Sequence, residues 1–309
     1  MKRRTLILFK YTSFRKITPG EFFYLESIID KNGKILINLK SLNRKTSLFT
    51  GGYIGMQKEL NGMFWSTGSF DLDLPYIGDT KKACAIFKKN LVEITWNCMR
   101  SLENNPTTLP QTATILEGQS VGGISIFDLM QVKNYGDGCK NLIWQLFNDE
   151  FSLSIKSACL IHSFVAKEDA LEWGVIRNKA VSLHNIKYVP PTENLPQILE
   201  GGFNYLTKEI KSPAERAIAT FLFMARTQPF YDANKRTASL MMNGCLMKDG
   251  YFPITVLNRE AELFHKELGK FYETGDANGM FKFFENNLKE LYTPQQRKDF
   301  PRPSIELER

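Results

Sequence analysis

The segment Gln228–Thr237 places a carboxylate, an amide and two cations in a short polar loop between two apolar stretches. Asp232 supplies a hard oxygen ligand of the kind that holds Mg²⁺ together with substrate phosphates. Residues 234–237 are expected to open a helix, whose first N–H groups lack partners within the helix and favour anions. These residue types therefore predict a site for a magnesium-bound triphosphate. The loop holds no histidine to take a proton.

Other residues of the loop are expected to shape it and to add charge. Pro229 and Phe230 are suited to anchoring the loop on the core, and the small Ala233 lets a ligand approach the backbone. Lys235 adds a full positive charge, and Arg236 can bind two phosphate oxygens at once. An Asn-Lys-Arg triplet alone is usually a solvated helix start, so the prediction depends on the preceding carboxylate and on the apolar flanks.

Helical patterns flank the loop on both sides. Ser212-Pro-Ala-Glu215 is a capping box with proline in the first turn, and the helix that it opens carries apolar residues at a spacing that buries one face. Residues 238–247 are apolar nearly all round, which is typical of a helix in the middle of a core. Gly250 is expected to end that helix.

The remaining sequence predicts mixed structure before residue 106 and mainly helices after it. A capping pattern at residues 18–21 and a turn signal at Asn32-Gly33 predict a first helix followed by a strand at 35–37. Residues 173–191 have an extended pattern that predicts a hairpin or flap, residues 51–74 resist assignment, and residues 292–309 are expected to form a loose tail. Helices are expected at about 18–30, 81–102, 110–117, 125–135, 152–167, 259–273 and 276–291.

Composition restricts the class of protein. The 309 residues are 43% hydrophobic and 24% charged, as in globular proteins, and no apolar run approaches the ~18 residues of a membrane span. Five scattered cysteines favour a reducing cytoplasm over a disulfide framework, and three widely separated histidines do not predict a zinc site. The net charge of +7 suits an anionic ligand such as ATP or nucleic acid, although a solvated basic surface is the commoner explanation.

The loop resembles the active-site loop of the Fic family, including its Doc branch. The family pattern is His-Pro-Phe-x-Asp/Glu-Gly-Asn-Gly-Arg-x-x-Arg, and the run Asp-Ala-Asn-Lys-Arg-Thr-Ala looks still more like the Doc form. Residues 212–217, 174–177 with 190–191, and 250–253 are similar to family landmarks around the loop. The motif residues that match are Pro229, Phe230, Asp232, Asn234 and Arg236.

This resemblance implies a fold and a chemistry. The fold is a mainly α, Fic-type helical bundle over residues 106–291 with a small β-hairpin flap at 174–191 that docks a target protein, preceded by an N-terminal mixed α/β region, 1–105, of unknown role. The chemistry is ATP–Mg²⁺ binding and transfer of AMP to a target hydroxyl, or of the terminal phosphate in Doc-like members. Asp232 would hold the metal, Asn234 and Arg236 the phosphates, and the amides of residues 233–237 would complete the phosphate site.

One departure from the family pattern concerns the proton. Gln228 stands where the family has its catalytic histidine, and an amide can orient a hydroxyl but takes no proton near neutral pH. Because general base catalysis contributes ~10²–10⁴-fold, we expect slow turnover with ATP affinity largely intact. His184 in the predicted flap is an alternative base, with a plain surface histidine as the commoner role. His162 is expected to be a packed core residue.

Other departures concern regulation and nucleotide placement. Thr112–Gly118 looks like the inhibitory helix of the family, with Glu117 and Gly118 as its regulatory residues, but Ser239 replaces the arginine that pairs with this glutamate. Either Glu117 pairs with another cation, such as Lys235 or Arg236, or the autoinhibitory switch has lapsed. Lys235 stands in place of a glycine, which in the Doc branch goes with reversed nucleotide placement and leaves phosphate transfer open.

Three functions stay open on the sequence alone. The leading one is an ATP–Mg²⁺-binding relative of protein adenylyltransferases with weak or lost activity. The second is an active transferase with an altered mechanism, including Doc-like phosphotransfer. The third is a protein or nucleic-acid interaction module, for which the aromatic and basic region 1–105 leaves room.

Overall fold

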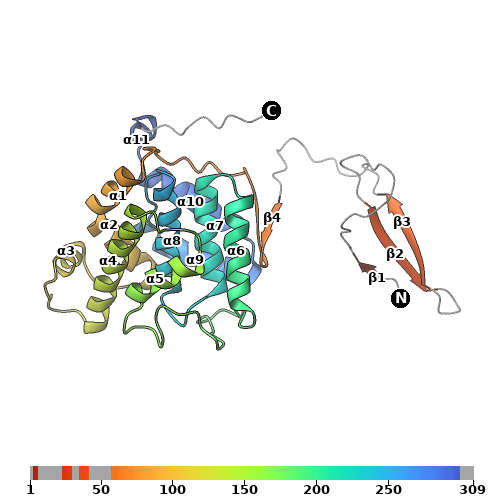
Figure 1. The fold of residues 1–309 in the computed structure, drawn as a ribbon, viewed down its shortest axis with the longest axis horizontal. Helices are drawn as coiled ribbons and strands as arrows, with labels where there is room; N and C mark the ends of the chain where they lie inside the picture. Colours follow the sequence, from red (N-terminus) through yellow and green to blue (C-terminus); the bar gives the residue numbers. More distant parts are fainter. Residues whose placement is uncertain (1–2, 6–22, 30–34, 42–56, 300–309) are drawn as a thin grey trace. The chain divides into compact units, whose positions relative to one another are not determined.

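The computed structural model describes residues 3–5, 23–29, 35–41 and 57–299. It divides into two compact units, Met1–Tyr53 and Ile54–Arg309 (Figure 1). Residues 54–105, which we predicted as part of a separate N-terminal region, thus belong to the larger unit. Among the residues that the structure describes, no helix is long and apolar enough to cross a membrane.

The described residues of the smaller unit form an antiparallel sheet in the order β1-β2-β3, with β1 at Arg3–Thr5, β2 at Phe23–Ile29 and β3 at Ile35–Ser41. The predicted helix is wrong for residues 23–29, where aromatic and β-branched residues favour a strand over the capping signal that precedes them. The predicted strand at 35–37 is confirmed within β3. The capping pattern at 18–21 and the turn at Asn32-Gly33 lie outside the described residues.

The larger unit is a bundle of helices around α7 and α8, which pack side by side at its centre (Figure 1). Nearly every residue of α8 is buried, as its apolar sequence predicts; Lys235 and Lys248 are the exceptions. The helices are α1 Thr80–Lys89, α2 Leu91–Glu103, α3 Leu109–Leu116, α4 Ile126–Phe147, α5 Ile155–Val165, α6 Leu195–Glu209, α7 Pro213–Thr227, α8 Asn234–Lys248, α9 Ala261–Thr274, α10 Asn278–Leu291 and α11 Pro294–Asp299, with a 3₁₀ turn at Asn258–Glu260.

Several predicted elements need correction. The single helix expected at 81–102 is divided at Asn90 into α1 and α2, α4 continues to Phe147, and part of the predicted tail forms α11. The segment 173–191 consists of bends, a turn and irregular chain and contains no strand, so the predicted hairpin flap is not formed. Helix α6 was not predicted, because its glycines are untypical of a helix. A Cβ atom on Gly202 would lie 2.1 Å from the Phe223 ring, so this glycine allows α6 to pack closely on α7.

The unassigned segment 51–74 contributes a hairpin, β4 (Gln57–Leu60) and β5 (Met63–Ser66). Its fully buried Trp65 donates from Nε1 to the Glu215 carboxylate of α7 at 2.7 Å, and the Thr67 hydroxyl donates to the same oxygen at 2.9 Å. Ser212 caps α7 by accepting from the Glu215 N–H. The Glu215 side chain, expected to complete that capping box, holds the hairpin instead.

We expect Glu215→Ala to lower the free energy of unfolding by about 2–4 kcal/mol, because it leaves the buried Trp65 N–H without an acceptor. Urea denaturation followed by tryptophan fluorescence measures the change. The exposed Glu200→Ala on α6 is the matched control and should stay within about 0.5 kcal/mol of the parent chain. Equal losses in the two variants would contradict this assignment.

Candidate functional site

The loop between α7 and α8 is bounded by two residues in the left-handed conformation. Gln228 ends α7 with φ 49°, and Ala233 precedes α8 with φ 54°. A residue with a Cβ atom adopts this conformation at a cost of about 1–2 kcal/mol, so contacts around the loop must offset the strain.

The side chain of Asn234 supplies these contacts. Its Oδ1 accepts from the Phe230 N–H at 2.9 Å, while its Nδ2 donates to the Phe230 carbonyl and to Gln228 Oε1, both at 2.9 Å. Gln228 Nε2 donates in turn to the Ala225 carbonyl at 2.6 Å. The Phe230 N–H can only donate and the Ala225 carbonyl can only accept, so the oxygen and nitrogen of each side-chain amide are assigned. Asn234 is buried and closes the loop, and its amide donors are already used.

Segment 174–191 is attached to the back of this loop through Arg177. This arginine is 2% exposed, and its guanidinium donates to main-chain carbonyls on both sides of the contact. The carbonyls within 2.7 Å are those of Gln228, Pro191 and Lys179. The Arg177 N–H also donates to the Pro229 carbonyl at 3.1 Å.

The two loop cations are engaged within the protein. Arg236 is fully buried, with Nη1 2.7 Å from Asp169 Oδ2 and Nε 3.5 Å from Glu103 Oε1. Burial lowers the pKa of Arg236, but Glu103, Asp169 and Asp232 together raise it above its ordinary value. Lys235 Nζ donates to the Leu102 carbonyl and lies 3.9 Å from Glu103 Oε1. Arg236 was predicted to bind phosphate, but its guanidinium is buried and paired with carboxylates of the protein.

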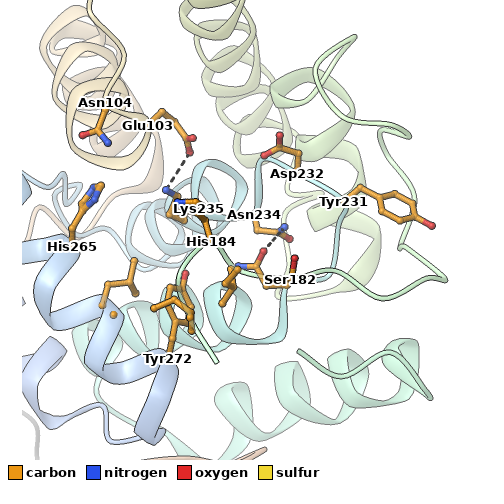
Figure 2. A pocket seen from close by; sticks show the side chains of 15 residues that line it. Glu103, Asn104, Ser182, His184, Tyr231, Asp232, Asn234, Lys235, His265 and Tyr272 are labelled. Atoms are coloured by element: carbon orange, nitrogen blue, oxygen red, sulfur yellow. Dashed lines mark hydrogen bonds and ion pairs between the residues drawn. The ribbon is translucent and has the colours of Figure 1, made fainter. Parts of the chain in front are cut away.

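A pocket of about 510 Å³ opens in front of the loop (Figure 2). Asp232 lies at its edge with 57% of its side chain exposed, and its Oδ1 accepts from the Ala233 N–H at 2.5 Å. Tyr231 points away from the other labelled residues and donates to Asn178 at 3.0 Å (Figure 2). The lining consists of Glu103, Asn104, Ser182, Leu183, His184, Ile186, Gln228, Tyr231, Asp232, Asn234, Lys235, His265, Leu268, Gly269 and Tyr272.

The start of α8 carries no side-chain cap. The N–H groups of its first turn are therefore available to an anion, apart from that of Thr237, which donates to the Ala233 carbonyl at 2.9 Å. Among the described residues no cluster of three or more His, Cys, Asp or Glu could hold a metal. A cation at Asp232 would thus take its remaining oxygen ligands from phosphate and water.

Two histidines line the pocket. His184 comes from segment 174–191, and His265 comes from α9 with Nε2 2.5 Å from the Ser101 carbonyl. His184 was predicted as an alternative base, whereas His265, Glu103 and Tyr272 were not predicted as site residues. These residues come from helices distant in sequence, and no local motif marks them.

The segment predicted as an inhibitory helix is α3, which begins with a capping box between Thr108 and Gln111. Glu117 is exposed at its end, followed by Gly118 with φ 87°. Of the carboxylates in the described part of the chain, Glu103 of α2 is the one that contacts both Lys235 and Arg236. Of the two alternatives predicted for Glu117, pairing with Lys235 or Arg236 is not found among the described residues.

Ser239, predicted to stand in place of an arginine, is buried between helices. Its hydroxyl lies 3.4 Å from the Tyr135 hydroxyl and 3.8 Å from Cys98 Sγ. Burial raises the pKa of the Cys98 thiol to about 12, so the thiol stays neutral. This position is part of the packed core and does not face the pocket.

A family model for the Fic/DOC family matches residues 152–246, which include α5, α7, the loop and most of α8. Residues 152–246 form a Fic/DOC family domain. The chain is 29% identical over 192 residues to the protein adenylyltransferase Fic of Nematostella vectensis, covering 59% of this chain and 44% of that protein. The corresponding protein of Culex quinquefasciatus is 28% identical over 188 residues, covering 59% and 37%. The match thus spans less than half of these relatives.

Solved structures share the mainly helical Fic-like fold. Fic-1 of C. elegans aligns with a TM-score of 0.59 and 20% identity, over 69% of this chain and 67% of that chain. A Fic domain containing signaling protein of Bacteroides thetaiotaomicron aligns with a TM-score of 0.54 and 19% identity, over 69% and 88%. At this level of identity the likeness concerns the fold.

The pairing of Glu103 with the loop cations predicts an effect on anion binding. Glu103→Gln removes a negative charge within 4 Å of Lys235 and Arg236, so affinity for pyrophosphate should rise roughly tenfold. Isothermal titration calorimetry at low salt measures it. Glu117→Gln is the matched control and should leave the affinity unchanged. If Glu117→Gln had the larger effect, the carboxylate that controls anion binding would be Glu117 and not Glu103.

Proposed function

We propose that this chain is a nucleotide-binding protein that holds ATP–Mg²⁺ at the start of α8 and has weak or no transferase activity. The observation that carries the proposal is the exposed carboxylate of Asp232 beside an uncapped helix start, both facing one pocket. Its relatives in Nematostella and Culex are named protein adenylyltransferases, which supports ATP as the nucleotide and a protein hydroxyl as the ancestral acceptor.

The described residues fit part of a magnesium–triphosphate group. Asp232 suits the cation, and the amides of Asn234 and Lys235 suit phosphate oxygens. The Arg236 guanidinium and the Asn234 side chain do not fit as ligands, because both are buried and engaged. When bound, the metal would neutralise phosphate charge. The protein's own part is to bind and orient the nucleotide.

Gln228 has a restricted role in this proposal. Its Nε2 donates to the Ala225 carbonyl, and its Oε1 already accepts one hydrogen bond from Asn234. The remaining lone pair of Oε1 can orient a hydroxyl without removing its proton. In this proposal the transferase activity is low because a general base is missing, whereas the loop keeps the geometry that binds the nucleotide.

A second candidate is an active transferase with an altered mechanism, which includes transfer of the terminal phosphate. The observation that favours it is that His184 and His265 line the same pocket as Gln228. Histidine is the side-chain type that most often serves as a general base, so either residue could replace the missing one.

Calorimetry tests the proposed ligand. ATP with Mg²⁺ should bind, and Asp232→Ala should weaken that binding at least tenfold while leaving the affinity for ATP in EDTA nearly unchanged, since only the metal ligand is lost. Glu209→Ala, an exposed carboxylate on α6, is the control. If the parent chain fails to bind ATP–Mg²⁺, the proposal is wrong.

Labelled ATP separates the two candidates. With α-labelled ATP and lysate proteins, Gln228→His should raise labelling by about 10²–10⁴-fold over the parent chain, because it restores the base. The double variant that adds Asp232→Ala should remove the gain. Strong labelling by the parent chain, lost in His184→Gln or His265→Gln, would favour the second candidate, and label from γ-ATP alone would mean phosphotransfer.

A further inference from the structure

His162 of α5 contacts three parts of the site, although it lies outside the pocket. Its side chain is fully buried. The ring stacks face to face on Phe230, with centroids 3.7 Å apart and planes inclined by 6°. Its two nitrogens contact main-chain groups, one at Gly174 and the other at Asp232.

These contacts determine the tautomer of the imidazole. The Gly174 N–H is a donor and lies 2.9 Å from Nδ1, so Nδ1 must accept and carries no hydrogen. Nε2 therefore holds the hydrogen of the neutral ring and donates it to the Asp232 carbonyl at 3.2 Å. Burial lowers the pKa of His162 to about 4, so the ring is neutral at pH 7. With both nitrogens engaged, His162 is not a candidate for proton transfer.

The backbone of Asp232 depends on this contact. The Asp232 side chain is 57% exposed, and its Oδ1 lies 3.7 Å from Arg236 Nη2. The next residue, Ala233, has a strained left-handed backbone. Rotation of the intervening peptide would turn the Asp232 carbonyl and would also move the Ala233 N–H, which donates to Asp232 Oδ1 at 2.5 Å and so holds the carboxylate. The hydrogen bond from Nε2 fixes the carbonyl and thereby limits that rotation.

The other nitrogen contacts the start of segment 174–191. Gly174 has φ 77°, and a Cβ atom there would lie 3.0 Å from Ser163 Cβ and 3.5 Å from the Cys159 carbonyl. Any larger residue would be both strained and forced away from α5. Gly174 thus allows its N–H to approach Nδ1, and the imidazole connects this segment to the loop.

We propose that His162 is a positioning residue that sets the place of the Asp232 carboxylate, and so tunes magnesium-dependent nucleotide binding, by holding the Asp232 carbonyl against the segment that starts at Gly174. This inference rests on the proposed function, because it assumes that Asp232 is the metal ligand. It adds a residue that neither touches the metal nor lines the pocket. Partners of this kind typically change metal affinity 10–100-fold when they are removed.

Three substitutions separate the contacts of the ring. His162→Phe keeps the stacking on Phe230 but loses both hydrogen bonds. His162→Gln places an amide donor near the position of Nε2 and can restore the bond to Asp232. His162→Asn places an acceptor near the position of Nδ1 and can restore only the bond from Gly174. Thermal melting of each variant reports whether the fold is retained.

The measured quantity is the ratio of the ATP affinity with Mg²⁺ to that in EDTA, obtained by calorimetry on the full chain. We expect this ratio to fall about tenfold in His162→Phe and His162→Asn and to return to within about threefold of the parent value in His162→Gln. The affinity in EDTA should change little. A purely structural role would lower both affinities together, in proportion to the loss of stability.

The outcomes distinguish this inference from the proposed function. A parent chain that does not bind ATP–Mg²⁺ overturns the proposed function. If the parent chain binds ATP–Mg²⁺ but the affinity ratio is unchanged in all folded variants, the role of His162 alone is overturned. The same holds if the ratio falls equally in His162→Gln and His162→Phe.

If the variants do not fold, ¹⁵N NMR of the parent chain decides. His162 must then be the neutral Nε2–H tautomer, and its Nε2 resonance must shift with the same midpoint as Mg²⁺–ATP binding; the opposite tautomer or an unmoved resonance contradicts the proposal.

Discussion

The side-chain amide of Asn234 is the interaction on which the site depends. It pairs with both main-chain groups of Phe230 and with the Gln228 amide, and so it closes a loop whose two ends have left-handed backbones. Without this closure, the strained loop would depend on the contacts that Arg177 makes with Gln228 and that His162 makes with Asp232.

Charge around the loop is arranged in two layers. In the buried layer, Arg236 is neutralised by Asp169 and Glu103, while Arg177 has its guanidinium surrounded by main-chain carbonyls. In the exposed layer, Asp232 and the uncapped amides of α8 face the pocket, and Asp232 Oδ1 lies 3.7 Å from Nη2 of the buried Arg236. The buried cations thus support the loop, and the exposed groups are those with capacity left for a ligand. This division explains why charged motif residues need not all be ligands.

The sequence predicted the parts of the molecule that have local causes. The helices on both sides of the loop follow from capping residues and apolar periodicity, and the position of Asp232 before a helix start follows from the motif. The partners of Arg236 were not predictable, because Asp169 and Glu103 lie 67 and 133 positions away with no pattern that marks them. The strand at 23–29 and helix α6 were missed because intrinsic preference and close glycine packing prevailed over the local signals that we read.

Arg177 has a consequence for any protein that approaches segment 174–191. Because its guanidinium binds carbonyls on both sides of the contact, this edge is already ordered before anything docks. A partner that binds such an ordered edge therefore avoids most of the loss of conformational entropy that ordering a flexible loop would cost. Recognition there would then be decided by the shape and chemistry of a rigid surface, and the rate of encounter would not be limited by folding of the segment.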